Sequence, residues 1–110
     1  MEYYKLKDGR QVWDIIVDCD LNFFQGSIFS YLQRAGKKTV DVINDYEKSL
    51  HYLNYWKENH DKIKQTQSKE ITMEENWFFL QHILKPTVTV TDICCLIDKI
   101  KTIMWSKDIK

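Results

Sequence analysis

One short cationic stretch has the residue types and spacing for binding an anion. Arg34, Gly36, Lys37 and Lys38 bring a guanidinium, a residue without a side chain and two ammonium groups close together. They precede the expected start of a helix at Thr39, whose free N–H groups and dipole favour negative charge. Arg34 can bind two phosphate oxygens through its planar fork, while either lysine adds a point charge. Taken by itself, however, the stretch favours a structural interpretation, because cations near a helix end also offset the helix dipole.

The cysteine and histidine residues form no pattern typical of catalysis or metal binding. There are three of each, namely Cys19, Cys94, Cys95, His51, His60 and His82. The cysteines fall on apolar helical patterns, which is typical of structural thiols rather than reactive ones. The histidines lack the HxxxH spacing that places two metal ligands on one helix face. We therefore expect no catalytic residue, no metal site and no cofactor.

Motifs of known nucleotide enzymes are also missing from the sequence. There is no GxxxxGK[ST] loop of the kind that holds phosphates in P-loop kinases. All-α nucleotide pyrophosphohydrolases need clustered acidic residues on facing helices, and the chain has no ExxE–ExxD pair. Asp41 and Asp45 share one helix face, which is more typical of a solvated face near a helix start. Whether the chain is an enzyme stays open, with a non-catalytic protein favoured.

Length, charge and composition predict one helical domain over residues 1–110. The 110 residues are the size of a single domain, and Lys plus Arg balance Asp plus Glu at 16 each. A sequence-independent nucleic-acid binder normally has a basic excess, so nucleic acid is not an expected partner. The N-terminal residues lack a signal-peptide core, and no apolar run approaches the ~20 residues of a membrane span. We expect a soluble cytoplasmic protein without a membrane partner.

Few breaking residues and a helical apolar spacing predict an all-α fold. Only three glycines and one proline interrupt the chain, which favours long helices over a turn-rich β fold. Apolar residues three and four positions apart predict about five helices in a small bundle. The expected helices lie near residues 12–19, 22–35, 39–65, 72–85 and 91–104.

The segments between these helices divide the chain into parts. Residues 57–71 are so polar that they are either an extension of the third helix or a linker. Residues 72–110 are expected to form a C-terminal helical pair. The alternating stretch TVTVT looks strand-like, but without a partner strand the segment near residues 86–90 is expected to be a short extended connector.

Capping residues set the expected helix ends. Asn22 is the expected N-cap of the second helix, and Gly36 is the expected left-handed residue that ends it. Thr39 is the expected N-cap of the third helix, with Asp41 in the first turn. The remaining expected caps are a capping box of Thr72 with Glu75, then Thr91 or Asp92.

Aromatic residues make up 14% of the chain, and large rings dominate both cores and interfaces. Tyr52, Tyr55 and Trp56 span most of the circumference of one helix, so they cannot all face the core. Exposed aromatic clusters mark interfaces. Together with Trp77, these residues predict a contact surface for another protein or for further copies of this chain in a homo-oligomer.

Residues 3–55 contain a characteristic order of residue types. The positions that carry it are Tyr4, Leu21, Phe23, Gly26, Tyr31, Arg34, Ala35, Gly36, Lys38, Asp45, Lys48, Tyr52 and Leu53. This order resembles a small domain family common in bacteriophage and prophage genomes, of unknown function or described as nucleotide-kinase-like. The family pattern is His-Tyr, Gly-Asn, Lys-Tyr, Arg-Ala-Gly-x-Lys and Asp-Leu-x-Lys-Ala-x-x-Tyr-Leu. The resemblance covers about the first half of the chain, residues 1–56.

The resemblance implies a site for a nucleotide-type phosphate ligand. Its implied residues are Gly26, Ser27, Arg34, Gly36, Lys37 and Lys38. Three polar family residues are replaced here, since Tyr3, Ser27 and Ser30 stand where the family has His, Asn and Lys. Those positions are first choices for a catalytic set, so kinase-like chemistry is not expected in this chain.

Three functions follow as hypotheses. The first is a phage or prophage accessory protein in the host cytoplasm that sequesters a nucleotide or a host defence signal. The second is an inhibitor of a host protein that docks through the aromatic residues. The third and least favoured is a nucleotide enzyme with His51 or Asp45 in a chemical role. Arg34 is either an anion ligand or a structural partner of Asp41 or Asp45.

Overall fold

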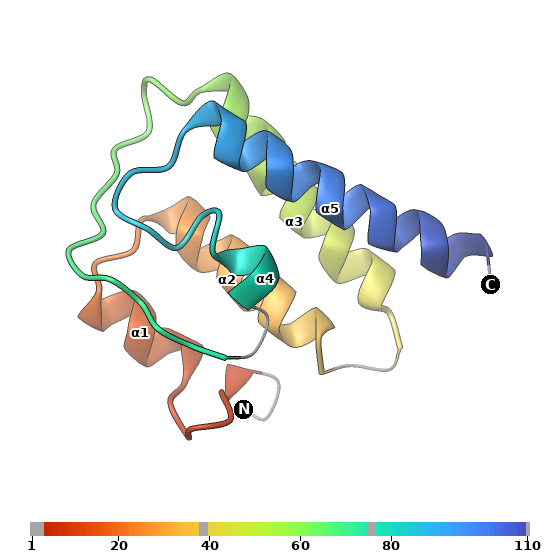
Figure 1. Cartoon of the computed structure of the whole chain (residues 1–110), viewed down its shortest axis with the longest axis horizontal. Coiled ribbons are helices and arrows are strands. Elements are labelled where there is room, and N and C mark those ends of the chain that lie inside the picture. Colours follow the sequence, from red (N-terminus) through yellow and green to blue (C-terminus); the bar gives the residue numbers. More distant parts are fainter. Residues whose placement is uncertain (1–3, 38–39, 75–76, 110) are drawn as a thin grey trace.

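The computed structural model describes residues 4–37, 40–74 and 77–109, and in these ranges every regular element is a helix (Figure 1). This confirms the all-α class and the expected number of helices. Residues 86–89 form the expected connector without helix. The five helices are α1 (Val12–Asp18), α2 (Phe23–Ala35), α3 (Val42–Glu58), α4 (Trp77–Leu80) and α5 (Val90–Ile109).

The helices pack around α3, which contacts both α2 and α5, while α1 packs against α2. In Figure 1, α5 runs alongside α3 and carries the chain to its C-terminal end. The side chains that pack between the helices are apolar, and their removal from water is the main favourable term in folding. The largest fully buried apolar side chains are Trp56, Phe29, Ile28, Leu53, Leu80, Ile83, Leu84, Ile93, Leu96, Ile100 and Val12.

Side-chain caps define where α2 and α5 begin. The Asn22 Oδ1 accepts a hydrogen bond from the Gln25 N–H at 2.8 Å, which confirms Asn22 as the N-cap of α2. For α5 the cap is Thr89, two residues before the expected Thr91. The Asp92 N–H donates to Thr89 Oγ1 at 3.1 Å, and the Thr89 N–H donates to Asp92 Oδ2 at 2.9 Å. Asp92 lies in the first turn, where its charge suits the helix dipole.

The turn between α2 and α3 differs from its expected form. Gly36 has φ −69°, so it is right-handed and not the left-handed stop that its residue type suggested. Its N–H donates to the Leu32 carbonyl at 3.1 Å, which continues the helical pattern past Ala35. The left-handed residue is Asp41, with φ 57°, which precedes α3 instead of lying in its first turn. Aspartate tolerates this conformation better than most residues. The expected cap Thr39 lies outside the described residues.

The third helix is shorter than its pattern suggested, because α3 ends at Glu58 and not near Gln65. The backbone N–H and the Nδ2 of Asn59 both donate to the Tyr55 carbonyl at 3.0 Å and close the last turn. The following residues have no apolar face that would bury a helix, and 59–74 contain none. Lys57 and Glu58 thus belong to the end of α3, and the rest of the polar segment, residues 59–71, is not helical and is called the linker below.

This linker is fixed against α1 and its C-terminal turn. The Thr66 Oγ1 donates to the Asp20 carbonyl at 2.7 Å, and the Ser68 N–H donates to the Cys19 carbonyl at 2.9 Å. These bonds give partners to polar groups at the end of α1 that a helix leaves without intrahelical bonds. The linker therefore belongs to the packed domain.

The expected helix at 72–85 is reduced to α4 and a following turn. Thr72 is not a cap, because it lies in a non-helical segment and α4 begins only at Trp77. Its carbonyl accepts a hydrogen bond from Arg10 Nη2 at 2.9 Å. Glu75, the expected second member of the box, lies outside the described residues. Ile71 and Met73 are buried while Thr72 between them is exposed, and this alternation is that of an extended segment. The packing of alternate side chains prevails here over the helical pattern.

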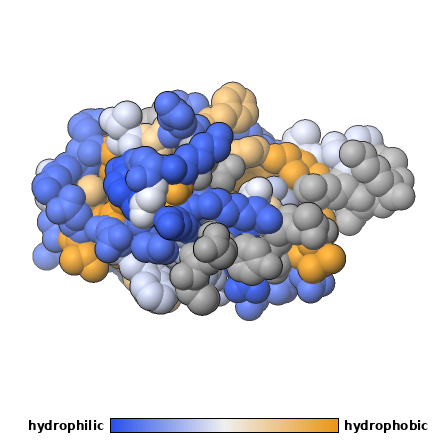
Figure 2. All heavy atoms as spheres, turned by 90° about the horizontal axis from the view of Figure 1, so that it is seen from below, coloured by the Kyte–Doolittle hydropathy of each residue, from blue (hydrophilic) through white to orange (hydrophobic). Residues whose placement is uncertain are grey.

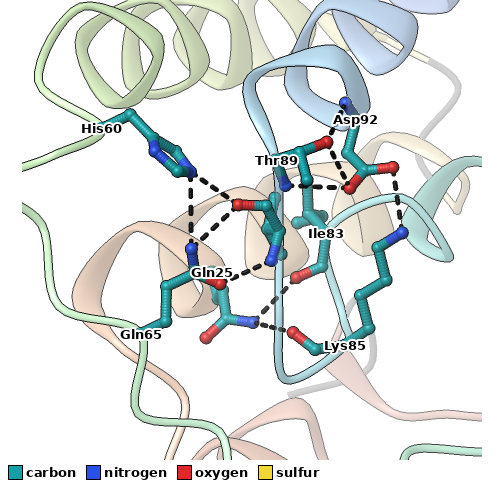
Figure 3. Close-up of polar contacts among 8 residues, drawn as sticks. Gln25, His60, Gln65, Ile83, Lys85, Thr89 and Asp92 are labelled. Carbon is teal, nitrogen blue, oxygen red and sulfur yellow. Dashed lines mark hydrogen bonds and ion pairs between the residues drawn. The ribbon is translucent and has the colours of Figure 1, made fainter.

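The buried amide of Gln25 joins three segments of the chain, and Figure 3 shows its contacts with Ile83 and Lys85. Gln25 is only 2% exposed, and its Nε2 donates to the Ile83 carbonyl at 2.8 Å and to Gln67 Oε1 at 2.9 Å. The Lys85 carbonyl lies 3.5 Å from the same nitrogen. Since a buried polar group without a partner costs stability, these bonds fix α2 against the linker and against the turn before Pro86.

A second glutamine connects the linker to the segment before α5. The Gln65 Nε2 donates to the Val88 carbonyl at 2.8 Å, and the Val88 N–H donates back to Gln65 Oε1 at 2.5 Å. His60 Nε2 donates to the same carbonyl at 2.6 Å (Figure 3). Side-chain amides thus replace the backbone pairing that two adjacent extended segments would otherwise form.

The outer surface is mixed in polarity. The face in Figure 2 is largely hydrophilic, with hydrophobic residues in separate small groups. Scattered exposed apolar residues are normal for a folded domain. No helix among the described residues is both long and apolar enough to span a membrane. The large apolar side chains that are exposed are Trp13, Val17, Phe23, Val40, Tyr55, Phe78, Val90 and Trp105.

Replacing the buried amide tests its role in the fold. We expect Gln25→Leu to lower the free energy of unfolding by about 2 kcal/mol, because Gln67 and the Ile83 carbonyl lose a buried donor. The measurement is urea-induced unfolding followed by circular dichroism. Gln81→Leu is the matched control, since Gln81 is less buried and donates only to the Phe78 carbonyl at 3.3 Å. Equal losses in the two variants would contradict the role assigned to Gln25.

Candidate functional site

A cleft of about 510 Å³ opens where α1, α2 and α3 meet. We call it the aromatic cleft, because rings from all three helices and from the N-terminal turn line it. Its volume is in the range of ~300–1,000 Å³ that small-molecule sites occupy. The lining residues of α2 are three or four positions apart and therefore share one helix face. They are Phe23, Gly26, Ser27, Ser30, Tyr31 and Arg34.

Gly26 brings α1 close to α2 at this cleft. A Cβ atom at position 26 would lie 3.3 Å from Cδ1 of Ile16, which is closer than ordinary van der Waals contact. The Ser30 Oγ donates to the Gly26 carbonyl at 2.8 Å and lies one turn further along the same face. The glycine at this position is therefore explained by helix packing, and Ile16 and Gly26 both line the cleft.

A charged pair lies at the end of the cleft formed by the last turn of α2. The Arg34 Nε is 3.6 Å from Asp45 Oδ2, and the Asp45 side chain is only 2% exposed. Arg34 Nη1 also donates to the Tyr4 hydroxyl at 3.3 Å. A buried carboxylate needs such a partner, because desolvation of a charge is costly. Arg34 is thus a structural partner of Asp45, and its side chain, 36% exposed, also lines the cleft.

The face of α3 that lines the cleft combines charge and hydrogen-bonding groups. Asn44, Asp45, Lys48 and Tyr52 follow one another at helical spacing, so they lie along one side of α3. The Lys48 Nζ is 5.6 Å from the centroid of the Tyr31 ring on α2. This distance is within the reach of a cation–π contact. The cleft therefore has a second cation beside the Arg34–Asp45 pair.

Ring contacts build the walls of the cleft. Phe23 and Tyr52 meet edge to face with centroids 5.6 Å apart, and Tyr52 stacks with Tyr31 at 5.9 Å. On the α1 side, Trp13 stacks with Tyr4 at 6.4 Å. Trp13 is 60% exposed and Phe23 is 67% exposed, so both rings present area to solvent. Such rings provide a stacking surface for a planar ligand group.

Burial, together with the neighbouring Tyr52 hydroxyl, raises the pKa of Tyr31 above its ordinary value. The Tyr31 hydroxyl therefore stays protonated at neutral pH and can donate a hydrogen bond.

The expected ligand residues are only partly brought together. Gly26, Ser27 and Arg34 line the aromatic cleft, whereas Gly36 and Lys37 do not. Lys37 instead donates from Nζ to a backbone carbonyl of the N-terminal turn, that of Lys5. Lys38 lies outside the described residues. The cationic stretch thus holds the N-terminal turn through Arg34 and Lys37.

The residues expected to form a protein interface lie in different environments. Tyr52 lines the cleft, and Tyr55 is 56% exposed. Trp56 is wrong as a contact residue for a partner, because it is fully buried. The inward face of α3 carries the polar residues Asp45 and Ser49 as well as Leu53 and Trp56. Because these polar residues interrupt the apolar pattern, the sequence does not identify this face of α3 as the buried one. The side chain of Trp77 is outside the described part.

The cysteine and histidine side chains are dispersed. Cys19 is buried, which raises the pKa of its thiol, whereas Cys95 is exposed despite its apolar neighbours in sequence. Burial lowers the pKa of His82, and His60 bonds to a backbone carbonyl as described above. Within the part of the chain that the structure describes, no three His, Cys, Asp or Glu side chains are grouped to hold a metal ion.

Several lining residues were not identified as site residues from the sequence, although signals existed. Lys48 follows Asp45 by three positions and precedes Tyr52 by four, so the helical spacing places all three on one face. Trp13 stands outside the apolar stripe of its helix, which marks it as an exposed ring. Tyr4 belongs to the resemblance pattern but had no assigned role. What sequence alone did not supply was the packing of α1 across α2.

Comparisons with protein-family models, with curated proteins and with solved structures gave no match. The phage-family resemblance of residues 3–55 therefore stays a prediction. The function is argued below from the geometry of the aromatic cleft together with that resemblance.

The Arg34–Asp45 pair is expected to stabilise the fold. Arg34→Met keeps much of the stem but leaves the buried Asp45 carboxylate without this cation, so we expect a loss of about 2 kcal/mol in unfolding free energy. Adding Asp45→Asn should recover part of the loss, and a double-mutant cycle from urea unfolding measures the coupling. Lys69→Met, which removes a cation from an exposed pair with Asp18 at 3.1 Å, should change stability little. A coupling near zero would contradict the pairing.

Proposed function

We propose that this chain binds a nucleotide-type phosphate ligand in the aromatic cleft without chemically changing it. The observation that supports the proposal is one concave surface that combines exposed rings, two cations and several hydroxyl and amide groups. Concave sites with aromatic walls and a few convergent polar groups are the usual form of small-molecule sites. A nucleotide offers a planar base, a sugar with hydroxyl groups and an anion, which match these three sets.

Each part of the ligand has a place in this proposal. The base stacks on Trp13 or Phe23, whose rings are exposed at the cleft. The phosphate lies near Lys48 and Arg34, where two cations outnumber the single carboxylate of Asp45. The sugar accepts and donates hydrogen bonds at the side chains of Ser27, Ser30 and Asn44, which also line the cleft. In this proposal Lys48 is the lysine that binds the phosphate, in place of Lys37 and Lys38, which the sequence suggested for that role.

The biological role we propose follows from the resemblance of residues 3–55. A phage or prophage accessory protein that binds a nucleotide without turnover would sequester it, whether as a metabolite or as a host defence signal. The setting would be the cytoplasm of the host bacterium. The serines at positions 27 and 30, which replace the polar residues of the family pattern, support a binding protein over a kinase-like enzyme.

Calorimetric titration with AMP, ATP and adenosine tests the proposal. We expect both nucleotides to bind, and Lys48→Met to weaken ATP binding by about tenfold or more, because a charged hydrogen bond to phosphate is lost. Adenosine binding should change less than about twofold. Lys101→Met is the matched control, since Lys101 is an exposed lysine of α5 away from the cleft. Failure of all three probes to bind, or equal behaviour of the two variants, would overturn the proposal.

A second candidate function is inhibition of a host protein through exposed rings. The observation that favours it is Tyr55, which is 56% exposed although it stacks on Phe24 at 5.6 Å. Phe23 is exposed beside the same cluster. Exposed aromatic residues are frequent anchors of protein interfaces. With Trp56 buried, this function would depend on Tyr52, Tyr55 and Phe23.

Tyr55→Ala separates the second candidate from the first, because Tyr55 does not line the aromatic cleft. If rings dock a partner, affinity capture from a host extract should retain one protein with the natural sequence and lose it with Tyr55→Ala, while AMP affinity stays unchanged. Glu58→Ala, an exposed change on the same helix, should retain the protein. Light scattering of the purified chain would show whether the partner is a second copy. Identical captures with the two variants would rule out this surface.

A further inference from the structure

A second depression continues from the aromatic cleft along α3. It has a volume of about 370 Å³ and is lined by Tyr31, Lys48, His51 and Tyr52. Three of these residues, all except His51, also line the aromatic cleft. Lys48 is therefore the cation at the boundary between the two depressions.

Helix geometry explains how the two depressions are connected. His51 lies three residues after Lys48, so their side chains are neighbours on the surface of α3. His51 is exposed, and the ring pair of Tyr31 and Tyr52, with centroids 5.9 Å apart, lines both depressions. A ligand that passes over Lys48 would thus meet rings on both sides of one ammonium group.

The kind of side chain in the second depression indicates what it would hold. A longer polyphosphate would need further cations, since each phosphate brings negative charge. Of the described residues that line this depression, three carry rings and one carries an ammonium group. Rings of tyrosine and histidine provide stacking faces for a base. The arrangement of ring wall, cation and ring wall matches two bases joined through a phosphate.

We infer that the ligand is a dinucleotide, with one base in the aromatic cleft, the second base at His51, Tyr31 and Tyr52, and the linking phosphate at Lys48. This inference rests on the proposed function, because it uses the same cleft for the first nucleotide. It deepens that proposal by naming the ligand class and by assigning a binding role to His51. The base at His51 stacks on the imidazole or accepts a hydrogen bond from it.

Titration of pApA, a diadenylate with a 5′-phosphate, against AMP tests the inference. We expect pApA to bind at least about tenfold more tightly than AMP, because a second base stacks while the phosphate contact with Lys48, which AMP also makes, is kept. His51→Ala should weaken pApA binding by about tenfold and change AMP binding by less than about twofold. Glu58→Ala is the control on the same helix, and it should alter neither affinity. Since His51 and Glu58 are both exposed, both variants are expected to fold.

The outcomes separate this inference from the proposed function. Equal affinities for pApA and AMP, with no effect of His51→Ala, would overturn the dinucleotide and leave the nucleotide site in place. Absence of binding by both probes would overturn both. A longer oligoadenylate with a 5′-phosphate distinguishes a free dinucleotide from a nucleic-acid strand. If it binds more tightly than pApA, the ligand is a strand and the assignment to a free dinucleotide is wrong.

Discussion

The buried amide of Gln25 is the interaction on which the arrangement of this domain depends. The linker after α3 and the turn before Pro86 have no backbone ladder to α2, and Gln25 bonds to both. Because a buried amide must find partners, these segments are held beside the core face of α2. That leaves the opposite face of α2, where Ser27 and Arg34 project, for the cleft with α1 and α3. A polar bond within the core thus determines where a surface site can form.

A buried charge has a similar requirement for a partner in the cleft itself. Asp45 is buried at its end, and Arg34 is its partner, so this ion pair and the bond to the Tyr4 hydroxyl hold the guanidinium at the cleft. A side chain fixed in this way loses less conformational entropy on binding. The neighbouring Lys48 contacts only a ring among the contacts described, at 5.6 Å, and remains exposed. We therefore expect Arg34 to orient an anion and Lys48 to contribute most of the attraction.

The sequence predicts the helical class and the cap Asn22 well, because both follow from local rules of spacing and side-chain geometry. It fails where tertiary contacts compete with local preference. Asp41 takes the left-handed conformation expected of Gly36, and the linker is fixed by hydrogen bonds to α1 that no periodicity encodes. The burial of Trp56 was likewise hidden by the polar residues that share its face of α3. In the cleft, Arg34 is recognisable from sequence as a candidate cation, but the surface that it shares with Trp13 depends on how α1 crosses α2.

The positions of the indole rings have a practical consequence for spectroscopy. Trp56 is enclosed in the core and Trp13 stands at the wall of the cleft, 60% exposed. Emission from the first ring is sensitive to solvent entry, so it reports unfolding. Emission from the second is open to quenching by a group stacked on it, so it would report the ligand binding that we propose. In a variant that lacks Trp77 and the exposed Trp105, intrinsic fluorescence would therefore follow unfolding and the proposed binding together, without an added dye.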